Sequence, residues 1–206
     1  ALLRGWLERG MDADSISIVE PDAAIAKTLR EDPGVGAFAD PGELDPGCET
    51  VIFAVKPQVM KDVVPAYRPF AQAGAVFLSI AAGTTTGFLK GYLGADAAIV
   101  RAMPNTPAAI GRAITAAMAS DPVSEDQRQR CNDLLKAVGE VTWIDDEDLF
   151  DAVTALSGGG PAYVFLLAEC MARGGVDAGL PEDLARHLAN ATVAGAGELM
   201  GRSSDE

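Results

Sequence analysis

The chain is poor in the side chains that build metal and disulfide sites. Its 206 residues include three cysteines and one histidine, and Cys48, Cys131 and Cys170 stand far apart. This spacing fits neither a zinc motif nor a disulfide framework, so no metal ion is expected. With 49% hydrophobic residues, the composition predicts a globular, reduced, cytoplasmic protein.

Basic residues and long apolar runs are also scarce. The chain carries 16 Lys and Arg against 30 Asp and Glu, a net charge of −14 spread along its length. Such a surface repels a phosphate backbone, so nucleic acid is not an expected partner. No run approaches the roughly 20 apolar residues of a membrane span, and no cationic leader precedes an apolar segment. We therefore expect neither a membrane association nor export.

The first residues read as the inside of a helix. Residues 1–9 carry apolar side chains at helical spacing, and Gly10 follows as a stop signal. Because a domain seldom begins this way, we expect that something has been trimmed from the front. Residues 15–19 then alternate as a strand does, and Asp22 opens a helix that runs through about Arg30.

Alternating strands and helices follow along the middle of the chain. Residues 50–55, 75–80 and 97–102 are apolar runs bounded by turn residues, typical of buried parallel strands. Helices are expected from Pro57 to about Ala71 and from the Gly83-Thr84-Thr85-Thr86 segment. This alternation predicts an α/β protein with a Rossmann-like, doubly wound parallel sheet.

The pattern changes after Asp121, where a helix over 124–138 and a short strand over 140–144 are followed by helical sequence alone. We place a dinucleotide-binding domain at 1–144 and a helical domain at 145–206. Residues 162–171 are apolar nearly all round, which marks a helix buried on more than one side. In so short a chain, a partner subunit is the expected source of the second covering surface.

An open parallel sheet binds ligands at the carboxyl ends of its strands. Glu20 ends the first predicted strand, where a dinucleotide-binding fold usually places an acid for the adenosine ribose. The next strands end in segments that expose the backbone or form a rigid polar turn: Ala54-Val55-Lys56-Pro57, Ala81-Ala82-Gly83-Thr84 and Met103-Pro104-Asn105-Thr106-Pro107. We expect these segments to form the rim of one cleft.

Each of these residues also has a simpler interpretation. Glu20 fits a solvated strand end, Lys56 a surface cation, and Asn105 a turn former between two prolines. Thr84 fits a helix N-cap. Their occurrence at successive strand ends favours the cleft. His187 lies on a predicted helix and is expected to be structural or exposed.

Four segments carry a resemblance to a known family. They are Ala54-Val55-Lys56-Pro57, Ser79-Ile80-Ala81-Ala82-Gly83, Arg101-Ala102-Met103-Pro104-Asn105-Thr106-Pro107 and Leu156-Ser157-Gly158-Gly159-Gly160-Pro161-Ala162-Tyr163. In this order and spacing they resemble pyrroline-5-carboxylate reductase, over essentially the whole chain. The resemblance implies an oxidoreductase of proline biosynthesis that reduces 1-pyrroline-5-carboxylate to L-proline with NAD(P)H. It also implies a Rossmann domain, an all-helical dimerisation domain, and a homodimer or a higher oligomer built of dimers.

The resemblance also implies which residues form the site. It places Val55, Lys56 and Pro57, together with Ile80, Ala81 and Ala82, against the cofactor. It places Met103, Pro104, Asn105 and Thr106 near the nicotinamide, and Ser157, Gly158, Gly159 and Gly160 near the substrate. Glu20 and Ala54 complete the expected cofactor-binding set. The family usually has a serine at Gly159, so any hydrogen bond from that hydroxyl is lost here.

Two segments of the family pattern are not in the sequence. They are the first strand with its G-x-G-x-M-G phosphate loop, expected just before Ala1, and an S-P-G-G-T segment expected beyond Glu206. The expectation is therefore an internal piece of the enzyme, truncated at both ends and incomplete for activity.

The chemistry needs no catalytic acid, because an iminium carbon is already electrophilic and the cofactor supplies the hydride. Glu20 favours NADH, since it can accept ribose hydroxyls while its charge repels a 2′-phosphate. Two alternatives stay open. A 2-hydroxyacid or 6-phosphogluconate-like dehydrogenase would need a lysine in the helical region, where none follows Lys136. The second alternative is a non-catalytic module for dinucleotide binding or dimerisation.

Overall fold

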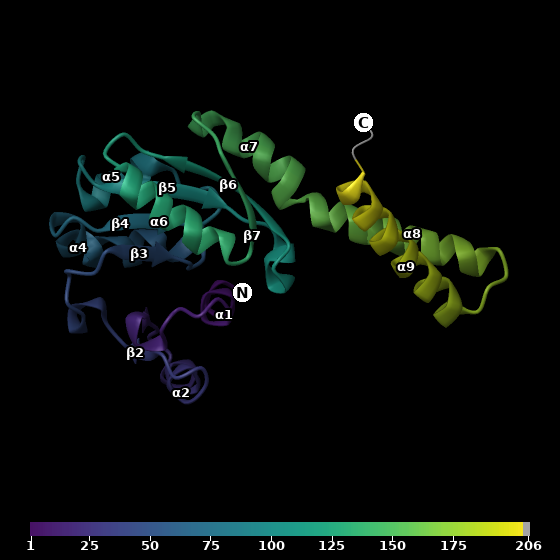
Figure 1. The fold of residues 1–206 in the computed structure, drawn as a ribbon, viewed down its shortest axis with the longest axis horizontal. Helices are drawn as coiled ribbons and strands as arrows, with labels where there is room; N and C mark the ends of the chain where they lie inside the picture. The colour runs from purple at the N-terminus through teal and green to yellow at the C-terminus, as the bar shows by residue number, and fades with distance from the viewer. Residues whose placement is uncertain (204–206) are drawn as a thin grey trace. The chain divides into compact units, whose positions relative to one another are not determined.

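A computed structural model describes residues 1–203 (Figure 1). Contacts divide the chain into two compact units, Ala1–Thr154 and the segment from Ala155 onward. The sequence places the domain boundary at residue 144, but residues 145–154 belong to the first unit. The reason is that Phe150 is buried there, with its ring over the Arg101 guanidinium.

Within residues 1–203 the strands form two separate hydrogen-bonded sheets. In the smaller sheet, β1 (Ser17–Val19) pairs parallel with β2 (Gly36–Phe38). The larger sheet has the order β3-β4-β5-β6-β7. Its strands are β3 (Thr50–Phe53), β4 (Val76–Ser79), β5 (Ala98–Met103), β6 (Ala113–Ala119) and β7 (Gly139–Trp143).

The larger sheet is mixed, which corrects the expectation of a wholly parallel one. β3, β4 and β5 run parallel, but β6 runs antiparallel to β5, and β7 is parallel to β6. Neither β2 nor β6 is predicted from the sequence. β6 is rich in alanine, which gives a weak strand signal, and its Ala116 and Ala117 are buried by their neighbours in the fold.

The helices of the first unit follow the predicted order. They are α1 (Leu2–Glu8), α2 (Ala23–Glu31), α3 (Met60–Val63), α4 (Arg68–Gln72), α5 (Thr86–Leu93), α6 (Glu125–Lys136) and α7 (Phe150–Val153). The expected single helix over 57–71 is instead a series of short helical pieces. Pro65 and Pro69 lack the amide hydrogen that a continuous helix needs, and each is the second residue of a new piece.

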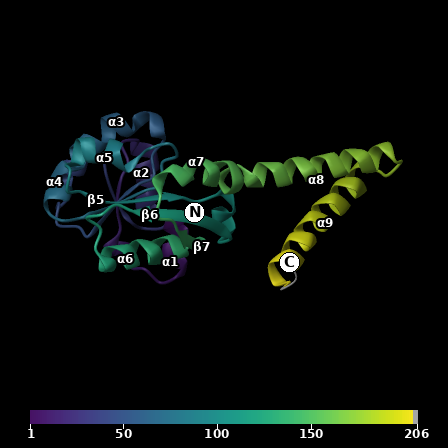
Figure 2. The same ribbon diagram turned by 90° about the horizontal axis from the view of Figure 1, so that it is seen from above.

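Alternate side chains of the strands fill two hydrophobic cores. Phe77 and Ile99 pack with α3 to α5 on one face, and Leu78 and Val100 pack with α6 on the other. Figure 2 shows α3, α4 and α5 on one side of the strands, and α6 with α1 on the other. This is the predicted doubly wound arrangement. Because helices cover both faces, the carboxyl edge of β3, β4 and β5 remains for a ligand.

The second unit is a pair of long helices. A π-helical turn (Thr154–Gly158) leads into α8 (Gly160–Asp177), and α9 (Glu182–Arg202) packs along it (Figure 1). In the described part of this unit, the buried hydrophobic residues are Ala185 and Ala189. The side chains of Tyr163 and Phe165 are more than half exposed. One copy of the chain therefore leaves the predicted apolar helix uncovered.

A continuous helical stretch, Glu147–Asp177, has the length and composition to cross a membrane. Its most apolar window has a mean hydropathy of 1.2, and 6% of that window is buried. The sequence analysis expected no segment long and apolar enough to span a membrane. Judged by length and composition alone, that expectation is wrong. A single helix of this kind is weak support for a membrane span, because helices of soluble proteins pass the same test.

Candidate functional site

Three of the predicted loops start from one edge of the larger sheet. The register pairs Phe53 with Ser79, and Ser79 with Arg101, so β3, β4 and β5 end side by side. The amide of Ile80 continues this pairing by donating to the Phe53 carbonyl at 3.1 Å. Residues 54–57 and 80–84 therefore leave the sheet next to each other, with the residues after Met103 on the far side of 80–84.

The loop after β3 is exposed from Ala54 to Pro57. Pro57 opens a 3-10 turn, and Lys56 before it has an extended backbone. Among residues 1–203, no carboxylate lies within ion-pair distance of the Lys56 ammonium. Val55 is also exposed. The loop thus presents one cation and one apolar side chain to a ligand.

The loop after β4 brings the backbone close to the surface. Gly83 has a φ of 72°, a conformation that residues with a Cβ rarely adopt. Ala82 beside it is exposed, while Ala81 is buried in the core. The N-cap of α5 is Thr85, whose hydroxyl accepts from the Phe88 amide at 3.1 Å, so the N-cap interpretation of Thr84 is wrong.

The loop after β5 is fastened by Asn105. Its Oδ1 accepts a hydrogen bond from the Ile114 amide at 3.1 Å, which ties the loop to the start of strand β6. Met103 and Pro104 are half-buried and Thr106 is exposed. The turn-former interpretation of Asn105 thus has a structural basis, since its side chain holds the return of the chain into β6.

Glu20 lies at the carboxyl end of β1, in the smaller sheet. Its amide donates to the Phe38 carbonyl at 2.8 Å, and its Oε1 accepts from the Asp22 amide at 2.9 Å. The backbone therefore fixes the direction of this half-buried carboxylate. Asp22 in turn caps α2, so the helix begins at the predicted place.

The glycine-rich residues 157–160 lie in the second unit. They span the end of the π-helical turn and the start of α8, so they interrupt the regular α-helix as the resemblance implies. His187 is exposed on α9, which agrees with the expectation of a structural or exposed residue. Among residues 1–203, no group of three or more His, Cys, Asp and Glu side chains gathers to hold a metal ion.

A partly buried ionic cluster beside these loops escaped the sequence analysis. Arg101 on β5 lies 2.9 Å from Glu147, which also accepts hydrogen bonds at 2.8 Å from the amide and the hydroxyl of Thr86. The Phe150 ring lies 4.1 Å from the Arg101 Cζ. Burial raises the pKa of Glu147, but the hydrogen bonds from Thr86 and the Arg101 charge outweigh it, and the net pKa is lowered.

One signal for this cluster was present in the sequence. Arg101 is a charge inside an otherwise apolar strand, and a buried charge needs a partner. Its partner, however, lies 46 residues further along the chain. No local pattern joins two such residues, so only the fold identifies the pair.

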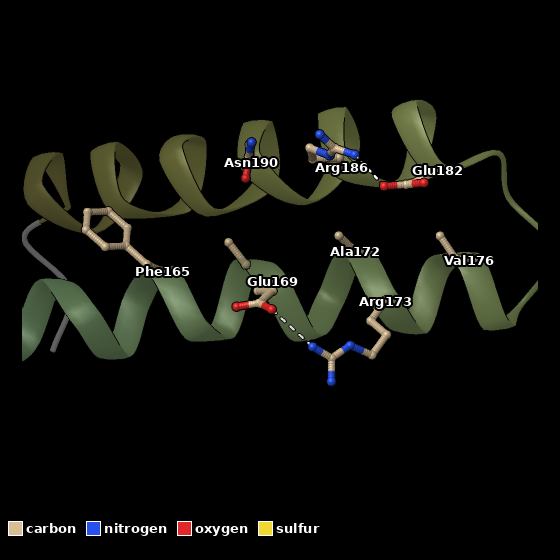
Figure 3. Close-up of a pocket in the computed structure, with 9 residues that line it drawn as sticks. Phe165, Glu169, Ala172, Arg173, Val176, Glu182, Arg186 and Asn190 are labelled. Carbon is tan, nitrogen blue, oxygen red and sulfur yellow. Dashed lines mark hydrogen bonds and ion pairs between the residues drawn. The ribbon is translucent and has the colours of Figure 1, made fainter.

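A groove runs between α8 and α9 (Figure 3). Its volume is about 540 Å³, and its apolar lining comes from Phe165, Ala168, Ala172 and Val176. Ion pairs lie along its two sides, Glu169 with Arg173 on α8 and Glu182 with Arg186 on α9. An apolar groove flanked by charged pairs is typical of a helix-packing surface.

Comparisons with known proteins agree with this architecture. The family model "Pyrroline-5-carboxylate reductase dimerisation" matches residues 147–206, and "NADP oxidoreductase coenzyme F420-dependent" matches residues 1–83. A pyrroline-5-carboxylate reductase from Pisum sativum is 38% identical over 199 residues, which cover 97% of this chain and 72% of the relative. The chain belongs to the pyrroline-5-carboxylate reductase family.

Further members of the pyrroline-5-carboxylate reductase family support the assignment. The enzyme of Pseudomonas aeruginosa is 35% identical over 97% of this chain and 73% of its own. The solved structure of a reductase from Coxiella burnetii, 30% identical, matches with a TM-score of 0.94 over all of this chain and 76% of that one. One from Plasmodium falciparum, with NADP bound, is 26% identical with a TM-score of 0.84, over 99% of this chain and 75% of that one.

The family assignment confirms several predictions. The chain is a pyrroline-5-carboxylate reductase of proline biosynthesis, with an NAD(P)-binding Rossmann-like domain followed by a helical dimerisation domain. Neither alternative function is supported, because the relatives that span nearly the whole chain are reductases. The dimerisation match also covers the long apolar helix, which agrees with the expected covering of its exposed surface by a partner subunit.

Proposed function

We propose that this reductase binds the nicotinamide cofactor along the loops after β3, β4 and β5. The observation that carries the proposal is the convergence of these loops at one edge of the parallel strands. The proposed contacts are the residues named from the sequence: Ala54, Val55, Lys56, Pro57, Ile80, Ala81, Ala82, Met103, Pro104, Asn105 and Thr106. For the buried Ala81, the contact is made by the backbone.

The residues present fit a dinucleotide. Small side chains and the Gly83 turn let the backbone approach a phosphate or ribose closely. Lys56, which forms no ion pair with any other residue of 1–203, offers a positive charge. Val55 and Met103 supply apolar surface for a planar ring. A cofactor bound here supplies the hydride, and the protein acts by orienting it toward the imine carbon, with residues 157–160 near the substrate.

A bulky side chain at Ala82 tests the cofactor site. Ala82 is exposed, so Ala82→Tyr leaves the core intact but obstructs the turn. We expect the KM for the reduced cofactor to rise about tenfold or more, with an unchanged circular dichroism spectrum. Ala73→Tyr, at an exposed position of the same unit, is the matched control. Equal kinetic constants in the two variants would contradict the proposed site.

We further propose that the enzyme prefers NADH to NADPH. Glu20 offers ribose hydroxyls an oriented carboxylate, and its charge repels a 2′-phosphate. The cations nearest in sequence have other partners, because Lys27 pairs with Glu31 at 3.7 Å and Arg30 donates to the Ala37 carbonyl.

The ratio of kcat/KM for the two cofactors measures this preference. Glu20→Ser removes the charge, and we expect the NADH:NADPH ratio to fall about tenfold, which corresponds to about 1.4 kcal/mol. Asp96→Ser, an exposed acid just before the amino end of β5, is the control and should leave the ratio near the wild-type value. A wild-type preference for NADPH, or an unchanged ratio in Glu20→Ser, would refute the proposal.

We propose a homodimer, built through α8 and α9, as the functional unit. The support comes from the dimerisation match over 147–206, the apolar groove between these helices and the exposed side chains along α8. A second copy offers the same apolar surface, as a two-fold interface requires. Higher oligomers built of such dimers are compatible with the same surface.

A reduced cytoplasmic compartment fits this enzyme. The three cysteines are free, and Cys131 is buried with the pKa of its thiol raised to about 12 by desolvation. Fractionation of cells that express a tagged chain tests this assignment, which a membrane or exported fraction would contradict.

A further inference from the structure

Glu147 holds two segments of the proposed cofactor cleft at once. Its Oε1 accepts hydrogen bonds from the Thr86 amide at 2.8 Å and from Arg101 Nη1 at 2.9 Å. Its Oε2 accepts one from the Thr86 hydroxyl at 2.8 Å. Thr86 begins α5, three residues after Gly83, and Arg101 lies two residues before the end of β5. One carboxylate therefore ties the loop after β4 to the end of β5.

The surroundings of Arg101 make this tie rigid. The Arg101 side chain is 9% exposed, and the buried Phe150 ring covers its guanidinium. A guanidinium buried to this degree has a large desolvation cost unless a carboxylate pairs with it. Removing Glu147 therefore forces Arg101 to move or to admit water, and it also removes the acceptor of the first amide of α5.

The position of Glu147 in the chain adds a second connection. It is the first residue of the segment that matches the dimerisation model, and Phe150 follows three positions later. Both residues nevertheless belong to the first compact unit. The start of the dimerisation segment is thus fastened to the strand ends that carry the proposed cofactor loops.

We propose that Glu147 is a positioning residue for the nicotinamide cofactor. Acting through Thr86 and Arg101, it sets the distance between the loop after β4 and the loop after β5. The inference rests on the proposed function, in which both loops contact the cofactor. Hydride transfer depends on close alignment of two reactants, and a displacement of about 1 Å can lower the rate about hundredfold.

The decisive variant is Glu147→Ala in the full-length protein. Cofactor binding is measured by the fluorescence of NADH, and steady-state constants are measured well below the melting temperature. We expect the KM for NADH to rise and kcat to fall, so that kcat/KM drops between about tenfold and hundredfold. A purely structural role predicts a lower melting temperature with kinetic constants of the folded enzyme unchanged.

Two graded variants sharpen this test. In Glu147→Gln, the amide oxygen can still accept from Thr86 and Arg101, and its NH₂ can donate to the Thr86 hydroxyl, but Arg101 loses its counter-charge. We therefore expect kcat/KM to be restored in part, to a value above that of the alanine variant. Thr86→Val removes the hydroxyl and leaves the amide contact, which predicts a value between those of the alanine variant and the wild type. Values of kcat/KM for Glu147→Gln and Thr86→Val that both lie between those of Glu147→Ala and the wild type support the proposal. A Glu147→Gln value as low as that of Glu147→Ala contradicts it.

Glu49→Ala is the matched control. It breaks another ion pair between distant elements, Glu49 with Arg130 at 3.3 Å, at an exposed position away from the loops. Its kinetic constants should match the wild type. If Glu147→Ala does the same, the positioning role is wrong while the cofactor site stands. If the wild type itself shows no saturable binding of NADH or NADPH, the proposed cofactor site fails and this inference fails with it.

Discussion

The two compact units bury their apolar side chains to very different degrees. In the first unit, Phe77 and Ile99 are 0% exposed, enclosed between the sheet and the helices that cover it. In the second, Phe165 on α8 is 67% exposed, and the buried hydrophobic residues of its described part are two alanines. One core is complete within a single chain. The other needs a second copy of the chain to remove comparable surface from water.

This difference shows where each unit obtains its stability. The first unit is stabilised by contacts within the chain, so its unfolding should not depend on protein concentration. The hairpin of α8 and α9 is stabilised by association, so its melting should move to higher temperature as the concentration rises. Substitutions in the first unit should therefore change a stability that is independent of protein concentration, and substitutions in the second should change association.

The largest expected effect is in the first core. Phe77 is fully buried on β4 and stacks on Phe53 at 5.7 Å between ring centroids. Phe77→Ala should lower the free energy of unfolding by about 3–5 kcal/mol, at every protein concentration. Urea unfolding followed by circular dichroism measures it. Phe88→Ala, at a partly exposed position of α5, is the control; equal losses in both variants would show that the first core is less complete than its burial indicates.

A charge in the groove of the hairpin should break association instead. Phe165→Glu should raise the dimer dissociation constant about hundredfold, or about 2.8 kcal/mol, because association would bury an unpaired carboxylate. Sedimentation velocity over a concentration series measures this. Ile25→Glu, at an exposed apolar position of α2, introduces the same charge in the first unit and should leave association unchanged. A monomeric wild type at micromolar concentration would refute the claim that the hairpin of α8 and α9 is stabilised by association.

Asn105 tests whether a residue of the first unit serves stability, function or both. Asn105→Ala leaves the Ile114 amide without its acceptor, which should cost about 1–3 kcal/mol of stability. Asn105→Asp keeps an acceptor oxygen and should recover most of that loss. If Asn105 also positions the cofactor, both variants should lose about tenfold or more in turnover. Full activity in a less stable Ala variant would leave only the turn-former role.

The smallest effect concerns acid unfolding through Glu147. Its pKa in the folded protein lies below its ordinary value of 4.5, mainly because hydrogen bonds from Thr86 outweigh burial. Its stabilising contribution is therefore fully present above pH 4.5 and is lost as the pH falls through the lowered pKa. The stability difference between the wild type and Glu147→Gln should be constant above this value and shrink below it. Urea titrations at a series of pH values measure the difference, and an increase toward acid would contradict the sign.

Much of the site was predictable because local patterns mark the ends of strands. The apolar runs that end near Phe53, Ser79 and Met103 locate β3, β4 and β5, and the turn residues after them locate the loops. The prediction of a single helix over 57–71 was wrong, because two prolines divide that stretch into shorter pieces. β6 was not predicted, because its alanines resemble a helix or a loop until the neighbouring strands bury them.

By itself, the sequence determined the family, the order of the main elements and the loops that form the candidate cleft, since each depends on residues adjacent in the chain. The tertiary structure decided the antiparallel course of β6, the bond from Ile114 to Asn105 and the partnership of Arg101 with Glu147. These pairs lie 9 and 46 residues apart. No periodicity connects such positions, and a buried charge or amide obtains its partner only after the chain has folded.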